Sequence, residues 1–299
     1  MGHRLDTIRF ALAALVCACL AAPVGASQDP DALRAAADQG DADAAYRLGR
    51  AYQRGDGVLR DREEGTRWVR TAAEQGHPRA QNDLGRAYAN GYGVPRDAEE
   101  AVRWFRLAAD NGFAIAQGNL GLAYTSGIGV EQDTDEALRW FQLAAAQDLP
   151  VAQHNVGLAY ANGTGVAEDD EEALRWFRLA ADQGHAAAQH NLAIAYANGL
   201  GGVSQDAAQA VRWFQLAADQ GHAAAQGNLG IAYSNGLGID RDAVEAVRWF
   251  RLAEERGYSP AGFALTELEP ILTFEELEEA ERLADEWRAA YRRARETTR

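Results

Sequence analysis

The sequence contains no lysine, and its only two cysteines, Cys17 and Cys19, lie near the N-terminus. All 29 basic residues are arginines, set against 44 acidic residues, and the formal net charge is −15. Nucleic-acid binding depends on a basic surface, so we expect no nucleic-acid partner. The absence of lysine also excludes the phosphate-binding lysine of a P-loop.

Residues 1–26 have the three parts of a secretory signal peptide. A basic segment, MGHRLDTIR, precedes the apolar run FALAALVCACLAA, and the small residues VGA at 24–26 form a cleavage site. The apolar run is too short to favour a permanent transmembrane helix. We expect cleavage near Ala26 and a periplasmic or secreted mature chain with no cysteine and no stable membrane span. The alternative is lipid attachment at Cys19, because VCAC at 16–19 loosely resembles a lipobox.

A repeat of 36 residues fills the chain from residue 41 to residue 257. The string RWF, once RWV, occurs six times, and its tryptophans are 36, 36, 36, 37 and 36 residues apart. Such self-similarity indicates a repeat architecture rather than two globular domains. The six units are 41–76, 77–112, 113–148, 149–184, 185–221 and 222–257, and their tryptophans are Trp68, Trp104, Trp140, Trp176, Trp213 and Trp249.

Each unit predicts two antiparallel helices. In unit 77–112, small and apolar residues around Leu84 recur at helical spacing, and Gly91 ends that helix. Asp97 and Glu100 then form a capping box that starts a second helix, which contains Trp104. The same aspartate recurs in every unit, at Asp61, Asp97, Asp133, Asp169, Asp206 and Asp242. The carboxylates are therefore explained as helix caps rather than as a catalytic pair.

A single hairpin cannot bury its tryptophan layer, whereas stacked hairpins share a continuous core. The sequence therefore predicts an all-α solenoid of six full repeats between terminal caps. Residues 27–40 supply an N-terminal capping helix that begins at Asp29 and Pro30. Residues 258–299 supply the C-terminal capping helices, the last of which carries one apolar stripe that includes Trp287.

The repeated pattern A-x-A-Q-x-N-L-G-x-A-Y-x-N-G-x-G-V-x-x-D-x-E-E-A-x-R-W-F-x-x-A-A-x-Q-G resembles the Sel-one-like repeat (SLR), a relative of the tetratricopeptide repeats. The resemblance implies a right-handed α/α superhelical solenoid that acts as a scaffold or adaptor for a protein or peptide partner. Exported bacterial members exist, and some cysteine-rich relatives have been called β-lactamases. This chain lacks those cysteines and has no S-x-x-K serine site. A cell-envelope hydrolase, β-lactamase-like or peptidoglycan-related, is therefore the alternative function, and we expect a protein that is not an enzyme.

Histidines are the residues that most suggest a metal. His77, His185 and His222 open their units, and His154 and His190 occupy equivalent positions 36 residues apart. Equivalent positions of stacked hairpins lie about 9–10 Å or more apart, which is too far for two ligands of one zinc ion. We therefore expect surface histidines, no metal and no cofactor.

One stripe of the first helices varies between units while the frame stays constant. First helices of such hairpins usually line the concave side, so this stripe is the candidate partner-binding groove, with an arginine end and an aliphatic run. The aliphatic side chains either face a peptide or pack between neighbouring units. The asparagines beside the stripe, Asn119, Asn155, Asn191 and Asn228, are expected to form a structural hydrogen-bond ladder. The candidate partner-binding residues are Tyr46, Arg50, Asn82, Arg86, Leu122, His154, Leu158, His190, Ile194 and Ile231.

The glycine-rich stretch NGLGGVSQD at 198–206 resembles a phosphate loop, but every other unit has an equivalent glycine-rich segment. Its glycines therefore end one helix and turn the chain toward the next cap. Only Gly202 has no counterpart, and it makes this unit 37 residues long. We expect a bulge that the loop absorbs, with Trp213 still in its layer.

Overall fold

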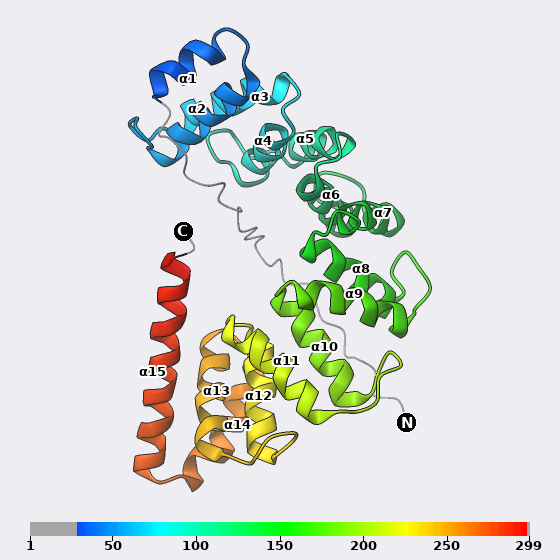
Figure 1. Cartoon of the computed structure of the whole chain (residues 1–299), viewed down its shortest axis with the longest axis vertical. Coiled ribbons are helices and arrows are strands. Elements are labelled where there is room, and N and C mark those ends of the chain that lie inside the picture. Colours follow the sequence, from blue (N-terminus) through cyan, green and yellow to red (C-terminus); the bar gives the residue numbers. More distant parts are fainter. Residues whose placement is uncertain (1–28, 298–299) are drawn as a thin grey trace.

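The computed structural model describes residues 29–297. Within this range the chain forms fifteen α-helices and one short 3-10 helix, with no strand, and the helices follow one another in an arc (Figure 1). The predicted signal peptide and lipidation site, residues 1–26, lie outside the described residues. The helices are α1 (Pro30–Ala37), α2 (Ala42–Arg54), α3 (Arg62–Glu74), α4 (Pro78–Asn90), α5 (Ala98–Asp110), α6 (Ala114–Ser126), α7 (Thr134–Ala145), α8 (Pro150–Asn162), α9 (Asp170–Asp182), α10 (Ala186–Asn198), α11 (Ala207–Asp219), α12 (Ala223–Asn235), α13 (Ala243–Glu255), α14 (Ser259–Leu268), the 3-10 helix η1 (Glu269–Ile271) and α15 (Phe274–Thr297).

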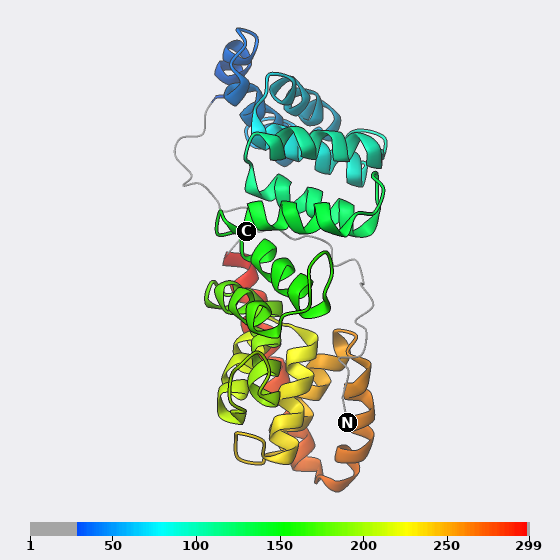
Figure 2. The ribbon, with the colours of Figure 1, turned by 90° about the vertical axis from the view of Figure 1, so that its right-hand side faces the viewer.

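Consecutive helices pair as hairpins, which stack along the long axis of the molecule (Figure 2). The even-numbered helices α2 to α12 are the first helices of the six units, and the odd-numbered helices α3 to α13 are the second helices. In the upper part of the arc, α4 and α6 lie on its inner side and α5 and α7 on its outer side (Figure 1). The predicted all-α solenoid is confirmed. No helix among residues 29–297 is both long and apolar enough to cross a membrane.

The helix boundaries follow the predicted caps. Each second helix of the repeats begins after its aspartate, whose side chain accepts a hydrogen bond from a backbone N–H of the first turn. Each first helix ends at a glycine in the left-handed conformation, such as Gly91 with φ +73°. The glycines therefore end the first helices and turn the chain toward the next cap, as predicted.

Glycine inside the first helices allows a close approach to the second helix of the same unit. A Cβ atom placed on Gly121 would lie 2.6 Å from the ring of Phe141, and one on Gly85 would lie 2.7 Å from the ring of Phe105. Glycine costs a helix about 1 kcal/mol relative to alanine. The tight contact with the phenylalanine ring explains why the chain carries glycine there.

The extra residue of the fifth unit lies in the loop between α10 and α11. Gly202 adopts a φ of +78° there, and α11 still begins after its cap, Asp206. Trp213 packs against two buried apolar clusters, one that contains Leu192 and one that contains Phe214. It is half-buried, as is the equivalent tryptophan of the preceding unit, Trp176. The loop absorbs the insertion, as predicted.

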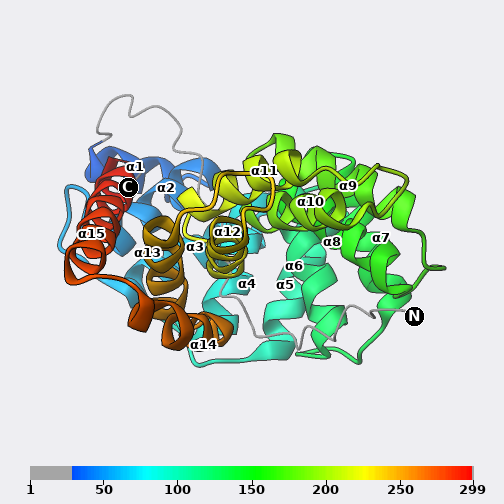
Figure 3. The same ribbon diagram turned by 90° about the horizontal axis from the view of Figure 1, so that it is seen from below.

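The two ends of the solenoid differ. At the N-terminal end, α1 begins after Asp29 and covers the first unit. At the C-terminal end, Thr273 and Glu276 form the predicted capping box of α15. This helix of 24 residues packs against α13, beside which it stands, and extends past the end of α13 (Figures 1 and 3). The predicted apolar stripe is confirmed, because Ala280, Ala284 and Trp287 are buried.

Candidate partner-binding site

The variable stripe lies on the surface formed by the first helices, and its aliphatic run is neither fully exposed nor fully packed. Leu122, Leu158 and Ile194 are half-buried, and the residue Ile231 is 39% exposed to solvent. Leu122 and Ile194 also pack against the buried clusters of their units. Packing against the repeat units is thus observed in part, and contact with a peptide stays a prediction. We call the exposed surface of α2 to α12 that includes these side chains the first-helix groove.

The arginine end of the groove is organised around one carboxylate, Asp83 of α4. Asp83 accepts hydrogen bonds of 3.0 Å from the hydroxyl of Tyr46 and from Arg50, and a nitrogen of Arg86 lies 3.7 Å from it. Burial, together with the charge of Asp83, raises the pKa of Tyr46. Two arginines share one carboxylate, so this cluster of three side chains keeps one excess positive charge.

The asparagines form a ladder between successive first helices, as predicted for three of the four. Asn119 of α6 donates a hydrogen bond of 2.9 Å to Asn82 of α4. Asn191 lies 3.1 Å from Nε2 of His154, and Asn228 lies 3.0 Å from Nε2 of His190. Asn82, His154 and His190 therefore belong to the packing between units. Assigning them to an exposed groove was wrong, because Asn82 and His190 are buried and His154 is mostly covered.

The prediction of surface histidines was also wrong. His77, His185 and His222 cap the first helices, and each accepts a hydrogen bond at Nδ1 from a backbone N–H of the first turn. The ring of His185 packs on that of His154, and the ring of His222 on that of His190, with centroids 4.8 and 4.7 Å apart.

Burial lowers the pKa of His154 and His190 from 6.5 to about 3, and that of His222 to about 4. These imidazoles are therefore neutral at physiological pH. No group of histidines and carboxylates among residues 29–297 has the arrangement of a metal site.

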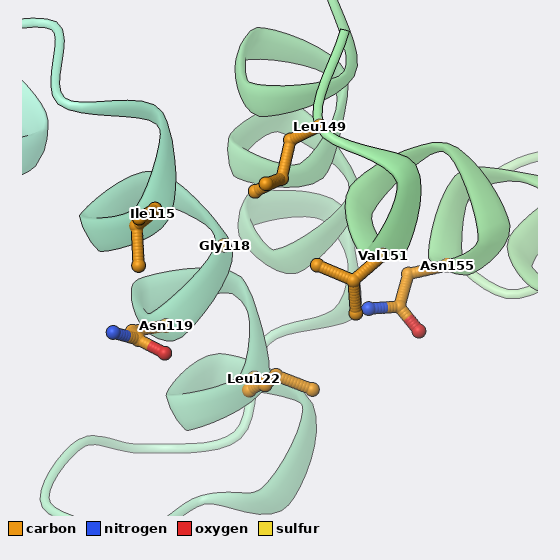
Figure 4. A pocket seen from close by; sticks show the side chains of 7 residues that line it. All are labelled: Ile115, Gly118, Asn119, Leu122, Leu149, Val151 and Asn155. Carbon is orange, nitrogen blue, oxygen red and sulfur yellow. The ribbon is translucent and has the colours of Figure 1, made fainter. Parts of the chain in front are cut away.

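The ladder is interrupted in the third unit, where its next member would be Gly118. Asn155 of α8 consequently has no side chain opposite it, and its amide forms no side-chain hydrogen bond. A small pocket opens at this position, with the amide of Asn155 at its edge (Figure 4). Its wall is apolar apart from two asparagines, and it is lined by Ile115, Gly118, Asn119, Leu122, Leu149, Val151 and Asn155.

The other glycine at this position of the repeat, Gly227, leaves no such pocket. A Cβ atom on Gly227 would lie 2.2 Å from the ring of Tyr258, so the tyrosine fills the space. A Cβ atom on Gly118 would meet only Leu149, at 3.4 Å. The pocket therefore arises from the combination of glycine at 118 with leucine at 149.

Sequence reasoning placed Leu122 in the groove but missed Ile115, Val151 and the pocket. Ile115 precedes Gly118 by three residues and so lies on the same side of α6. Alignment of the units could have indicated Ile115. The equivalent residues of the first two units are Asp43 and Arg79, and the third unit is the first to carry an aliphatic side chain at this position.

Comparison with known proteins identifies the repeat. The model of the Sel1 repeat family matches six consecutive segments that together cover residues 42 to 258, and each begins one residue after the unit read from the sequence. The chain belongs to the Sel1 repeat family. Its matched segments are 42–77, 78–113, 114–149, 150–185, 186–222 and 223–258.

Two solved structures of Sel1 repeat proteins are similar to the chain. One is c5321, described as a protective antigen present in uropathogenic Escherichia coli strains, with 34% identity over 89% of this chain and a TM-score of 0.76. The chain covers 56% of c5321, little more than half its length. The other, from Oxalobacter formigenes, is 39% identical over 79% of this chain and 68% of its own, with a TM-score of 0.70. No curated protein matches the chain.

Sel1 repeat proteins are generally protein-interaction scaffolds, and the chemistry of this groove is suited to binding. Its walls present aliphatic side chains, amides and a guanidinium pair that shares one carboxylate. Aliphatic walls bury apolar side chains, while amides and guanidinium groups orient a polar backbone or a carboxylate. The comparisons give no support to the hydrolase alternative.

Proposed function

We propose that the protein is an exported interaction scaffold that holds an extended peptide segment of a partner protein in the first-helix groove. The pocket at Gly118 carries this proposal. It joins an apolar wall from α6 and α8 to one amide, that of Asn155, which has no side-chain partner. An asparagine amide both donates and accepts, so it can bond the N–H and C=O groups of a peptide backbone.

The pocket is small, with a volume of about 10 Å³, so the proposal places in it no more than the terminal methyl group of one apolar side chain of the partner. Ile115, Leu122 and Val151 are already half-buried, so an inserted side chain would complete their burial. The neighbouring aliphatic residues Leu158 and Ile194 continue the same surface toward the C-terminal units. A partner segment with apolar residues that follow the repeat spacing fits this run.

Charge sets the direction of the partner. The first helices α2 and α4 carry more arginines than carboxylates, whereas the first helices α6, α8, α10 and α12 carry neither. Acidic residues or a terminal carboxylate of the partner would therefore lie beside the first two units. The arginines are Arg47, Arg50, Arg54, Arg79 and Arg86, and the carboxylates are Asp43 and Asp83.

The direct test is to fill the pocket with asparagine, the residue that the second unit carries at the equivalent position, 82. Gly118→Asn restores the pair with Asn155 on the pattern of Asn82 and Asn119, and there is room for its Cβ atom. Peptides selected by display on the purified chain should bind Gly118→Asn at least about tenfold more weakly, a loss of roughly 1.4 kcal/mol.

Gly112→Asn is the matched control, because the same substitution falls at a helix end with open space around it, and asparagine tolerates the left-handed φ of +79° there better than other side chains do. It should bind the selected peptides as the native chain does. Equal binding by Gly118→Asn and the native chain would contradict a partner site at this pocket.

Export is tested separately, on protein purified from the cells that make it. Mass spectrometry should find a mature chain that begins at Ser27, because the proposed cleavage follows Ala26. A chain that retains residues 1–26 would contradict export by cleavage, and a lipid on Cys19 would replace it with membrane anchoring.

A further inference from the structure

A second apolar feature lies on the second helices of the repeats. Each second helix from α5 to α13 carries a leucine three residues after its tryptophan. The first four of these leucines are 39 to 48% exposed, but the fifth, Leu252, is fully buried. We call the four exposed residues the leucine row: Leu107, Leu143, Leu179 and Leu216.

Leu252 is buried because α15 lies across α13. Leu252 shares an apolar cluster with Ala284 and Trp287 of α15. The indole of Trp287 meets that of Trp249 edge to face, with centroids 6.5 Å apart, and the ring of Tyr291 reaches Gly221 at the end of the preceding unit. The chain itself thus shows how an amphipathic helix covers this position.

Charged pairs fix α15 on both sides of Leu252. Arg251 bonds to Glu281 of α15 at 3.0 Å and to Glu269 of η1 at 2.7 Å, and Glu255 accepts a hydrogen bond of 3.2 Å from Arg288. Glu281 and Arg288 are seven residues apart, two turns of one helix. The covering helix therefore offers an acidic residue, a small apolar residue three positions later, a tryptophan at six and an arginine at seven.

Two other second helices carry the same arrangement of an arginine, a leucine and an acidic residue, and their leucine is exposed rather than covered by a helix. Helix α9 carries Arg178, Leu179 and Asp182 at the positions of Arg251, Leu252 and Glu255. Arg178 bonds only the neutral hydroxyl of Tyr196, at 3.0 Å.

Helix α5 repeats the arrangement. Arg106, Leu107 and Asp110 occupy the three equivalent positions, and Arg106 bonds the hydroxyl of Tyr124. The exposed surfaces of α5 and α9 thus match α13 in both charge and apolar character.

We propose that the leucine row, at α9 and α5, is a docking site for an amphipathic helix of a partner protein. The occupant carries the α15 pattern, with its acidic residue on Arg178 or Arg106 and its basic residue on Asp182 or Asp110. Its apolar residues cover Leu179 or Leu107 as Ala284 and Trp287 cover Leu252. This surface is separate from the first-helix groove, so the protein would join two partner segments.

The probe is a fluorescent peptide with the sequence of residues 274–297, titrated into the full chain. Its seat on α13 is already occupied by α15, so the open positions are those of the leucine row. Saturable binding should appear in fluorescence anisotropy. It should weaken at least about tenfold when the chain carries both Leu107→Glu and Leu179→Glu, or when the peptide carries Trp287→Ala.

Leu59→Glu is the matched control, because Leu59 is 91% exposed and lies in the loop between α2 and α3, off the row. It should bind the peptide as the native chain does, and so should Gly118→Asn, which separates this site from the groove. Circular dichroism spectra should show that the double variant keeps its helices.

Three results would overturn the proposal. The first is the absence of saturable binding. The second is binding that the double variant leaves unchanged, since the peptide would then exchange with α15 on α13. The third is self-association of the native chain in sedimentation that the double variant abolishes, since a second copy would then be the occupant.

Discussion

Nδ2 of Asn191 lies 3.1 Å from Nε2 of His154, although the two residues are 37 positions apart in the chain. With the amide as donor, Nε2 accepts, so the imidazole must be unprotonated there. The same relation holds between Asn228 and His190. Neutral imidazoles are thus part of the packing between α8, α10 and α12.

This relation predicts a loss of stability in mild acid. The folded-state pKa of His154 and of His190 is lowered from 6.5 to about 3. As the pH falls, these histidines are protonated in the unfolded chain before they are protonated in the folded chain. The contribution of the neutral imidazoles to the free energy of unfolding is therefore complete above about pH 6.5 and is lost as the pH falls toward 3. Urea unfolding should show the midpoint falling between about pH 7 and pH 4.5.

The control is a variant with His154→Asn and His190→Asn. It keeps the ladder, as Asn82 does with Asn119, and removes two of the four histidines whose pKa is lowered by burial, while His185 and His222 remain. Its midpoint should fall less over the same range than that of the native chain. An equal fall in both proteins would show that other titrating groups, not His154 and His190, control the acid sensitivity.

Removal of Asp83 should destabilise the N-terminal units. Its carboxylate has 14% of its exposure left and accepts bonds from Tyr46 and Arg50, so Asp83→Ala leaves those donors without their acceptor. We expect a loss of about 2–3 kcal/mol. Asp43→Ala removes an exposed carboxylate bonded to Arg47 and should cost less than about 1 kcal/mol in urea unfolding. Equal losses would contradict the central role of Asp83.

Two glycines inside first helices should respond to alanine in opposite ways. Gly85→Ala forces a Cβ atom to within 2.7 Å of Phe105, so overpacking of about 1–3 kcal/mol should exceed the gain in helix propensity. Gly118→Ala meets only Leu149, at 3.4 Å, and should stabilise by up to about 1 kcal/mol. Thermal unfolding should lower the midpoint of the first variant and raise that of the second. A shift of the midpoint in the same direction in both variants would contradict a difference between the two sites in the room available for a Cβ atom.

The repeat frame was predictable because its signals are local. An aspartate three residues before a glutamate starts a second helix, and a glycine in the left-handed conformation ends a first helix, whatever the neighbouring units contain. The six capping aspartates and the loop position of Gly202 were therefore predicted correctly from spacing alone.

The pairing between units was harder to predict because it depends on how far apart consecutive first helices lie. His154 was expected on the surface, but the approach of α10 buries it beside Asn191. Likewise, no spacing within α13 indicates that Leu252 is buried while Leu216 is exposed, since the helix that covers Leu252 comes some thirty residues later. The pocket at Gly118 also depends on both effects, a missing side chain on α6 and the placement of Leu149 before α8.

The first-helix groove is tested most directly by photo-crosslinking in the cells that make the protein. A benzophenone amino acid would replace Leu158, which continues the groove beside the pocket, or Arg139, which is exposed on α7. A single partner should be captured from position 158, not from position 139, and Gly118→Asn should abolish the adduct. Adducts of equal yield from both positions, or an adduct at 158 that persists with Gly118→Asn, would contradict a partner site in the groove.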